Sequence, residues 1–403
     1  MRARATLLAT GPVRRSFLSI SLAVSVAAAA AAGASSAQAA ARPHATSASS
    51  PTVSAAARLA GTWQLLPPAP VTSLPGDLTA VWTGNEMIIH GNYSPPNGGI
   101  RGVTFAYRPA TKIWVRLANG PTRASAFETT DVAVWTGSRM LTFGQTSATY
   151  NPATNTWRQM PLAPMSLFGA VTAWTGHQFL AWGGTCCEDQ SHDGAAYNPV
   201  SNTWRKLPIA PLIVRRDASG TWTGRDLVVA GGGHRVRIGE PLILLRDAAA
   251  YDPATGRWRT IAPMPRRTNG ATAVWDGREI LFIGGGRAGV PGPAPRGLAY
   301  NPVTNRWRLL PPMAFPRFGF AAVWTGRQLL VWGGVTVSGA PPPHGEAYTP
   351  ATNAWTALPA SPLRGRADPV AVWTGRQMIV WGGFSNGTPS RGFTDGAVYT
   401  PTR

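Results

Sequence analysis

The sequence predicts an all-β protein, a seven-bladed β-propeller in which the N-terminal outer strand completes the last blade. Three repeated features predict this fold. Seven copies of an apolar phrase such as AVWTGRQLLVWGG occur along the chain, a Tyr follows each copy, and a Trp stands seven residues after the Tyr in every completed copy. The copies recur about every 49 residues, and a period of that size is typical of propellers and other repeat folds.

Each copy contains four predicted strands. The first ends at the Trp of "AVW", and a Thr-Gly or Asp-Gly pair then forms a tight hairpin turn, since Gly tolerates positive φ. The second strand, such as "LLVW", is continuously apolar, which suits a strand covered on both faces. Gly-Gly ends it, the third strand ends at the Tyr before an Asn-Pro or Asp-Pro turn, and the fourth begins at the Trp.

One such sheet cannot bury both of its own faces, so the sheets are expected to stack radially with Trp and Tyr rings between them. The last copy ends at Arg403 without its Trp, whereas the first outer strand, "TWQLLP" at 62–67, precedes every blade. The strand of Trp63 is therefore expected to complete the last blade, which leaves no open edge at that point of the ring.

The apolar strand, the Gly-Gly pair, the Tyr and the Trp seven residues later together resemble the kelch-repeat family over residues 61–403. Blades 1 and 2 depart from the double Gly, with "HGN" at 90–92 and "FGQ" at 143–145. The resemblance implies a propeller whose ring is closed by a strand lent from one terminus to the blade at the other.

The N-terminal region is predicted to be a targeting segment. Residues 1–39 contain "RRSFL", a weakly apolar run and "AQA", which together indicate a signal peptide. The paired Arg resembles a twin-arginine signal, with general secretory export as the alternative. Residues 40–60 are rich in Ala, Ser and Thr and predict a disordered leader. From the signal peptide we expect a secreted or envelope-associated protein without a transmembrane segment after cleavage, and we expect it to be a monomer.

The net charge is +20, and nearly all of the positive charge is Arg. Arg residues recur just before the first strand of several blades, where they are expected at the mouth of the central channel. Guanidinium groups there would bind carboxylate, phosphate or sulfate in bidentate fashion. The alternative is that solvated Arg side chains merely cap strand ends. The ligand-binding candidates are Arg215, Arg216, Arg266, Arg267, Arg317, Arg364 and Arg366.

The loop "GGTCCEDQSHDGAAY" of blade 3 holds both cysteines, Cys186 and Cys187. Their adjacency in an exported protein predicts a vicinal disulfide, although neighbouring Cα atoms lie closer than in most disulfides. The same loop offers potential metal ligands, with a merely solvated polar loop as the alternative. These ligand candidates are Glu188, Asp189, His192 and Asp193.

Two enzyme groups with this fold are alternatives to a binding protein. The copper radical oxidases of the galactose oxidase type use two Tyr, two His and a Cys joined to one Tyr, but here seven of the eight Tyr belong to the repeat. Kelch sialate epimerases usually have six blades, and no pair of acidic residues is identifiable here. We therefore predict no catalytic residues and no cofactor. The predicted function is recognition of an anionic glycan, an envelope polymer or an acidic protein segment through the loop face, without specific nucleic-acid binding; a carbohydrate-acting kelch enzyme remains the alternative.

Overall fold

The computed structural model describes residues 59–71, 76–93, 101–121, 132–144, 147–186, 189–190, 193–236, 240–287, 292–342, 344–386 and 391–402. The chain divides into two units, Met1–Val53 and Ser54–Arg403, and every described residue belongs to the second. The predicted signal peptide and residues 40–58 of the predicted leader lie outside the described residues. In the described part of the chain, no helix is long and apolar enough to cross a membrane.

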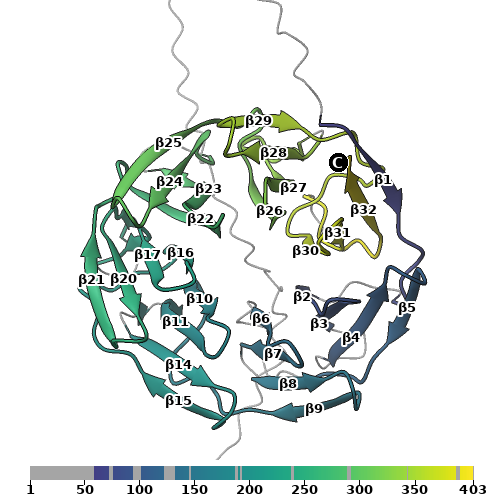
Figure 1. Cartoon of the computed structure of the whole chain (residues 1–403), viewed down its shortest axis with the longest axis horizontal. Helices are drawn as coiled ribbons and strands as arrows, with labels where there is room; N and C mark the ends of the chain where they lie inside the picture. Colours follow the sequence, from purple (N-terminus) through teal and green to yellow (C-terminus); the bar gives the residue numbers. More distant parts are fainter. Residues whose placement is uncertain are drawn as a thin grey trace, which may run out of the picture. The chain divides into compact units, whose positions relative to one another are not determined.

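The second unit is a seven-bladed β-propeller, as the sequence predicted (Figure 1). Each blade is a four-stranded antiparallel sheet, with its first strand nearest the axis of the ring and its fourth at the periphery. Blades 1 to 4 contain, in this order, β2 (Gly76–Trp82), β3 (Met87–Tyr93), β4 (Arg101–Arg108) and β5 (Ile113–Arg116); β6 (Val132–Trp135), β7 (Met140–Phe143), β8 (Ala148–Asn151) and β9 (Thr156–Gln159); β10 (Ala170–Trp174), β11 (Phe179–Gly183), β14 (Gly194–Asn198) and β15 (Thr203–Lys206); and β16 (Ser219–Trp222), β17 (Leu227–Ala230), β20 (Ala248–Asp252) and β21 (Arg257–Ile261).

The remaining blades follow the same order of strands. Blades 5 to 7 contain β22 (Thr268–Trp275), β23 (Ile280–Arg287), β24 (Arg296–Asn301) and β25 (Arg306–Pro312); β26 (Phe318–Trp324), β27 (Leu329–Val335), β28 (Glu346–Thr349) and β29 (Ala354–Ala357); and β30 (Val370–Trp373), β31 (Met378–Trp381), β32 (Gly396–Pro401) and β1 (Gly61–Leu65). Two short ribbons lie between second and third strands, where β12 (Thr185–Cys186) pairs with β13 (Asp189–Gln190) and β18 (Gly233–His234) pairs with β19 (Ile243–Leu244).

The ring closes as predicted, because the N-terminal strand β1 is the outer strand of blade 7. It pairs antiparallel with β32, with Trp63 opposite Tyr399. Leu59, just before the strand, packs against the apolar cluster between blades 6 and 7. Figure 1 shows β1 and β32 side by side although they come from opposite ends of the described part of the chain.

The seven closing Trp residues also join neighbouring blades by hydrogen bonds. Each indole Nε1–H donates to a backbone carbonyl at the end of the preceding blade's outer strand, at distances of 2.7–3.1 Å. The pairs are Trp63–Pro359, Trp114–Pro67, Trp157–Ala118, Trp204–Pro161, Trp258–Pro208, Trp307–Ala262 and Trp355–Pro311. Trp63 of β1 donates to blade 6, and Pro67 just after β1 accepts from Trp114 of blade 1. The strand β1 therefore has the same contacts with neighbouring blades as the other six outer strands.

The core is divided among the seven seams between neighbouring blades. Each seam holds its own cluster of buried apolar side chains. The seven repeat Tyr side chains are at most 3% exposed, and the second strands are buried along the phrase that the sequence showed as continuously apolar. Stacking the sheets radially is therefore what buries both faces of each one.

The antiparallel order fixes two faces of the ring. The tight Thr-Gly or Asp-Gly turns and the Asn-Pro turns lie on one face, called here the turn face, and the Gly of each tight turn has the expected positive φ, such as 105° at Gly84 and 92° at Gly326. The loops between second and third strands and the connections between blades lie on the other face, called the loop face. The predicted binding residues all belong to the loop face.

Candidate functional site

Three of the predicted ligand-binding arginines, Arg215, Arg317 and Arg366, are buried. Their side chains enter the seams before blades 4, 6 and 7 and are at most 1% exposed. In each, Nε donates to the carbonyl two residues earlier, at 2.9–3.0 Å. Nη1 donates to the carbonyl of a Gly near the end of the second strand, Gly231, Gly333 or Gly382, at 2.9–3.3 Å. Each guanidinium therefore joins the incoming connection to the inner part of its blade.

A carboxylate of the same blade completes each of these three contacts. Arg215 Nη2 lies 2.5 Å from Asp247 Oδ2, Arg317 Nη2 lies 2.5 Å from Glu346 Oε1, and Arg366 Nη1 lies 2.6 Å from Asp395 Oδ1. These three residue pairs are called the buried seam pairs below. Because the chain's own acceptors occupy the three guanidinium groups, they are not available to an external anion. The prediction that they face a ligand at the channel mouth does not fit this geometry.

The pair between Arg317 and Glu346 is the most enclosed of the three. Its two side chains are 0% and 2% exposed, whereas Asp247 and Asp395 are 44% and 52% exposed. Glu346 also accepts hydrogen bonds from the backbone N–H groups of Ala314 and Phe315 at 2.9 and 3.2 Å. Burial lowers the pKa of Arg317, and the adjacent Glu346 carboxylate opposes that shift.

Sequence reasoning identified the arginines but missed their carboxylate partners. A signal was present in the repeat, because Asp247 and Asp395 each stand four residues before the repeat Tyr and Glu346 stands two before it. The blades with an Arg seven residues before the inner Trp are blades 4, 6 and 7, and each of them has one of these acids.

Blade 5 has a different arrangement at the same positions. Thr268 takes the place of the buried Arg; it is 2% exposed, and its hydroxyl donates to the Gly286 carbonyl at 2.7 Å. Four residues before the repeat Tyr, where blades 4 and 7 have Asp, blade 5 has Arg296. The predicted candidate Arg267 precedes Thr268, and its side chain is exposed.

Three exposed arginines, Arg246, Arg267 and Arg296, come from adjacent segments of the loop face at this seam. Arg267 Nη1 donates to the Leu244 carbonyl at 2.9 Å, and the Arg246 carbonyl accepts a bond from the Met264 N–H at 2.7 Å. The half-buried Arg266 donates to the carbonyl of Arg296. We call Arg246, Arg267 and Arg296 the arginine seam cluster. None of the three forms an ion pair with a described residue.

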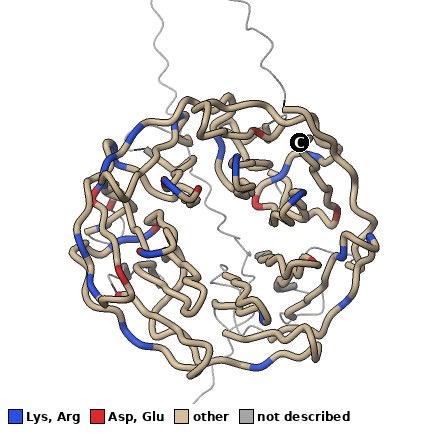
Figure 2. Tube along the Cα trace, in the orientation of Figure 1, with Lys and Arg blue, Asp and Glu red and all other residues tan. Residues whose placement is uncertain are grey.

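The other two predicted candidates lie at different seams. Arg216 is partly buried, and its Nε donates to Asp217 at 2.9 Å. Arg364 is exposed, and no hydrogen bond or ion pair of its side chain is found within the described ranges. The structure therefore brings Arg266 and Arg267 together at one seam and places Arg216 and Arg364 at the seams before blades 4 and 7. Figure 2 shows that basic positions outnumber acidic ones along the ring.

Asp217 and Asp368 occupy matching positions before the inner strands of blades 4 and 7. Both have positive φ, 52° and 50°, and each backbone N–H donates to a Gly carbonyl of the preceding blade. Asp217 accepts from Arg216, whereas the Asp368 carboxylate has no hydrogen bond to a described residue. Asp368 is reached by solvent but crowded by protein, and this desolvation raises its pKa from the ordinary 3.8.

The cysteine loop of blade 3 is only partly described. The backbones of Cys186 and Asp189 pair in the β12–β13 ribbon, and Asp193 is exposed. Cys187, Glu188 and His192 lie outside the described residues, so the predicted disulfide and metal site remain predictions. Among the described residues, no group of three or more His, Cys, Asp or Glu side chains is placed to hold a metal ion.

Comparison with known proteins leaves the family open. No protein-family model matches the chain, and no curated protein matches it at a significant level.

Proposed function

We propose that this chain is an exported kelch-type propeller that binds a polyanion, without catalysis, through the arginine seam cluster. One observation carries the proposal: three exposed guanidinium groups stand on adjacent segments of one seam without a carboxylate partner among the described residues. The seven copies of the kelch-like phrase support the family, and the N-terminal signal-like sequence supports export.

The contrast with the buried seam pairs supports this site. Where the chain uses Arg to hold a blade together, it supplies an acid at 2.5–2.6 Å. Arg246, Arg267 and Arg296 have no such partner among the described residues, so an anionic ligand would meet uncompensated positive charge there. Guanidinium groups present paired donors that match carboxylate and phosphate oxygens.

The ligand class follows from how the cluster is built. Its members come from the segment before β20, the connection into β22 and the start of β24, so three separate anionic groups can be met at once. A polymer with regularly repeated charges satisfies this better than a single small anion. Anionic glycans, phosphate-containing envelope polymers and acidic protein segments are the candidates.

The test compares two triple variants with the same change in net charge. Arg246→Ser/Arg267→Ser/Arg296→Ser removes the cluster, and Arg278→Ser/Arg327→Ser/Arg376→Ser removes three exposed arginines from turn-face hairpins. Binding to oligogalacturonate, poly(glycerol phosphate) and polyglutamate is measured at about 0.15 M salt, where long-range attraction is screened beyond about 8 Å. We expect the cluster variant to bind at least tenfold more weakly, a loss of about 1.4 kcal/mol, and the control variant to keep its affinity within about threefold.

Equal losses in the two variants would show that binding follows net charge and that the cluster is not a site. Absence of binding to all three polymers would remove the polyanion proposal. Recovery of a chemically altered glycan after incubation would favour the carbohydrate-acting enzyme instead.

A further inference from the structure

The short ribbon of blade 4, formed by β18 and β19, carries exposed apolar side chains beside the arginine seam cluster. Val236 stands two residues after the end of β18, and Ile243 is the first residue of β19. Ile213 belongs to the connection that enters blade 4 from blade 3. All three are exposed. We call Ile213, Val236 and Ile243 the apolar ribbon patch.

Backbone and side-chain contacts hold these three residues on neighbouring segments. The connection pairs with the ribbon through two backbone hydrogen bonds, at 2.9 and 3.0 Å. Close to them, His234 Nδ1 lies 3.1 Å from the carbonyl of Val214, the residue that follows Ile213. His234 also stands directly opposite Ile243 in the ribbon, and Val236 follows it by two residues. The connection and the ribbon therefore form one surface.

The same ribbon contacts the arginine seam cluster. Arg267 Nη1 donates to the carbonyl of Leu244, the second residue of β19, at 2.9 Å. The Thr268 N–H donates to the Leu245 carbonyl at 3.2 Å, and Arg246 comes next along the chain. The arginine seam cluster and the apolar ribbon patch are thus continuous on the loop face.

The surroundings of the ribbon are basic. The four described segments that form this surface carry six Arg and three acidic residues between them. They are residues 213–217, 233–236, 240–247 and 264–268. Two of the three acids, Asp217 and Asp247, are already in ion pairs with Arg216 and Arg215. A partner that covers the apolar ribbon patch meets this positive charge at its rim, which favours an acidic partner.

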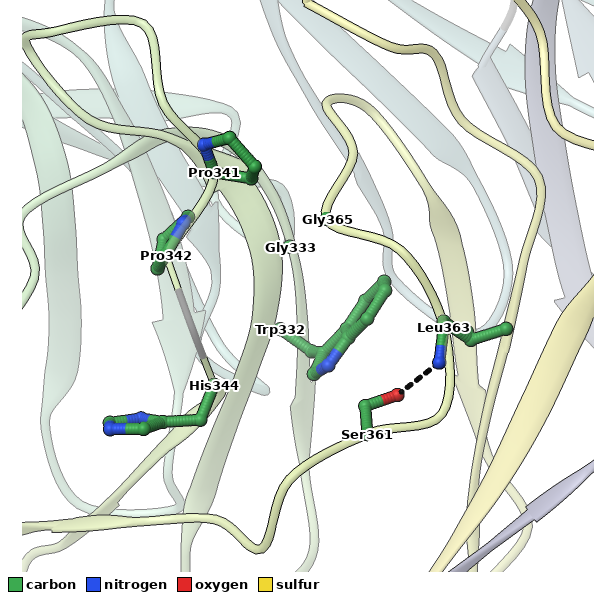
Figure 3. A pocket seen from close by; sticks show the side chains of 8 residues that line it. All are labelled: Trp332, Gly333, Pro341, Pro342, His344, Ser361, Leu363 and Gly365. Carbon is green, nitrogen blue, oxygen red and sulfur yellow. Dashed lines mark hydrogen bonds between the residues drawn. The ribbon is translucent and has the colours of Figure 1, made fainter.

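A hollow at another seam of the loop face lacks this combination. It is a pocket of about 200 Å³ between Trp332 and the connection into blade 7, and no Arg, Lys, Asp or Glu among the described residues lines it. Figure 3 shows the His344 imidazole and the Leu363 side chain pointing away from the space beside Trp332. That pocket has no charge with which to recruit an anion, so the ribbon of blade 4 is the surface that extends the polyanion site.

We propose that the ligand of the arginine seam cluster is an acidic protein segment whose apolar side chains pack on the apolar ribbon patch. This inference rests on the proposed function and selects one of its three ligand classes. Anionic glycans and poly(glycerol phosphate) supply charges but no aliphatic side chains to cover the patch. A segment with Glu or Asp beside Leu, Ile or Val supplies carboxylates for the guanidinium groups, and burial of its apolar surface adds to the affinity.

Two other occupants fit this surface less well. Ile213 and Ile243 are 52% and 46% exposed, so protein covers about half of each, and they do not project from the ring as residues that enter a bilayer interface must. A second copy of the chain, docked through the same surface, would bring the exposed arginines of both copies close together, and such like-charge contacts are costly. An acidic peptide meets neither obstacle.

The experiment compares two synthetic peptides of equal length and equal Glu content. The apolar peptide has Leu and Val between its Glu residues, and the polar peptide has Ser and Gly there. Fluorescence anisotropy measures their binding at about 0.15 M salt, where attraction is screened beyond about 8 Å. We expect the apolar peptide to bind at least tenfold more tightly, a difference of about 1.4 kcal/mol.

Two matched variants locate the source of that preference. The patch variant carries Ile213→Ser, Val236→Ser and Ile243→Ser. The control variant carries the same number of changes at exposed apolar residues outside this surface, Ile113→Ser, Val200→Ser and Val303→Ser. We expect the preference for the apolar peptide to fall below about threefold in the patch variant and to persist in the control variant. If the patch variant fails to fold, the two peptides on the wild-type protein and the single change Val236→Ser still decide the outcome.

Four results would overturn the inference. They are equal affinity for the two peptides, an apolar preference that survives in a folded patch variant, patch-dependent binding to phosphatidylglycerol vesicles without binding of the apolar peptide, and a dimer that dissociates in the patch variant. The last two would assign the surface to a bilayer or to a second copy. The proposed function fails separately, when the variant that lacks the arginine seam cluster keeps its affinity for poly(glycerol phosphate) and polyglutamate.

Discussion

The seam before blade 5 differs from the seams before blades 4, 6 and 7 at the same repeat positions. At the other three, an Arg is buried against Gly carbonyls and neutralised by an acid of its own blade. At blade 5 the buried position holds Thr268, and Arg296 stands where blades 4 and 7 have Asp. One backbone geometry thus accepts either a buried ion pair or a buried hydroxyl with basic residues outside it.

This difference distinguishes two kinds of Arg, buried and exposed, that cannot be told apart from the amino-acid composition. A buried guanidinium is tolerated only with a carboxylate and further acceptors, because uncompensated burial of a charge is costly. Three loop-face arginines meet that condition, and each joins the incoming connection to its own blade. Those of the arginine seam cluster have no carboxylate partner among the described residues, and they are exposed.

The largest effect is expected from opening the ring, on which every seam depends. Deleting residues 40–58 should leave thermal stability nearly unchanged, whereas deleting 40–68 removes β1 and with it the pairing of Trp63 with Tyr399. The exposed edge of β32 should then cause aggregation or a large fall in melting temperature. Thermal unfolding and light scattering of the two truncations provide the measurement. Equal melting temperatures would mean that β1 contributes nothing to closure.

The next largest effect on stability is expected from breaking the buried seam pair of blade 6. Arg317→Met should lower the free energy of unfolding by about 3–5 kcal/mol, because it leaves the Glu346 carboxylate buried and unpaired. Thr268→Val in blade 5 removes only one hydroxyl hydrogen bond and should cost about 1–2 kcal/mol. Urea unfolding of both variants gives the comparison. A cost for Arg317→Met no greater than that for Thr268→Val would refute the structural role assigned to the pair.

Much of the fold was predictable from the sequence because the same pattern of strands and turns occurs in seven copies. The tight turns, the doubly covered second strands and the strand lent by Trp63 each follow from a local pattern and simple geometry. The repeat Tyr side chains are buried as their fixed position indicated.

The site was less predictable from the sequence. The position of Arg317 in the repeat does not show whether its side chain is exposed to solvent or buried against a carboxylate. The decision depends on Glu346, 29 residues later and two residues before the Tyr, where the other blades place their acid four before it. Loop lengths between second and third strands vary, so the sequence does not show which acid reaches which Arg. Which segments lie beside Arg296 likewise depends on loop paths that no repeat pattern specifies.

A smaller effect, the recovery of part of a stability loss, is expected from converting blade 5 to the arrangement of blade 4. Thr268→Arg alone should destabilise the protein by several kcal/mol, because a guanidinium is buried without a carboxylate. Adding Arg296→Asp supplies the acid and should recover about 1.5 kcal/mol of that loss, the lower end of the range for one hydrogen bond to a charged group. The double variant should also bind polyanions more weakly than Thr268→Arg. Additive losses of stability would show that the two positions do not face each other as in blade 4.

The smallest effect on stability is expected from replacing Asp217 or Asp368, the carboxylates at matching positions of blades 4 and 7. Crowding by neighbouring protein atoms desolvates Asp368 and raises its pKa above 3.8, so its charged form is less favourable in the folded protein than in the unfolded one. This cost is present at neutral pH and disappears when the pH falls below the unfolded value, where the carboxyl is protonated in both states. Asp368→Asn should therefore stabilise the protein slightly at pH 7, within about 0.5 kcal/mol for so exposed a residue, and the gain should vanish near pH 3.

Asp217→Asn is the control for that change, because both residues have φ near 50° and Asn tolerates this conformation as well as Asp does. Asp217 accepts a hydrogen bond from Arg216 at 2.9 Å, so its replacement removes a charge-assisted bond and should not stabilise the protein at any pH. Melting temperatures of both variants between pH 3 and pH 7 decide between the two environments. If both variants gain stability equally at pH 7, the benefit comes from lowering a local negative charge or from the backbone preference of Asn. The distinction between a paired carboxylate in blade 4 and an unpaired one in blade 7 would then have no energetic consequence.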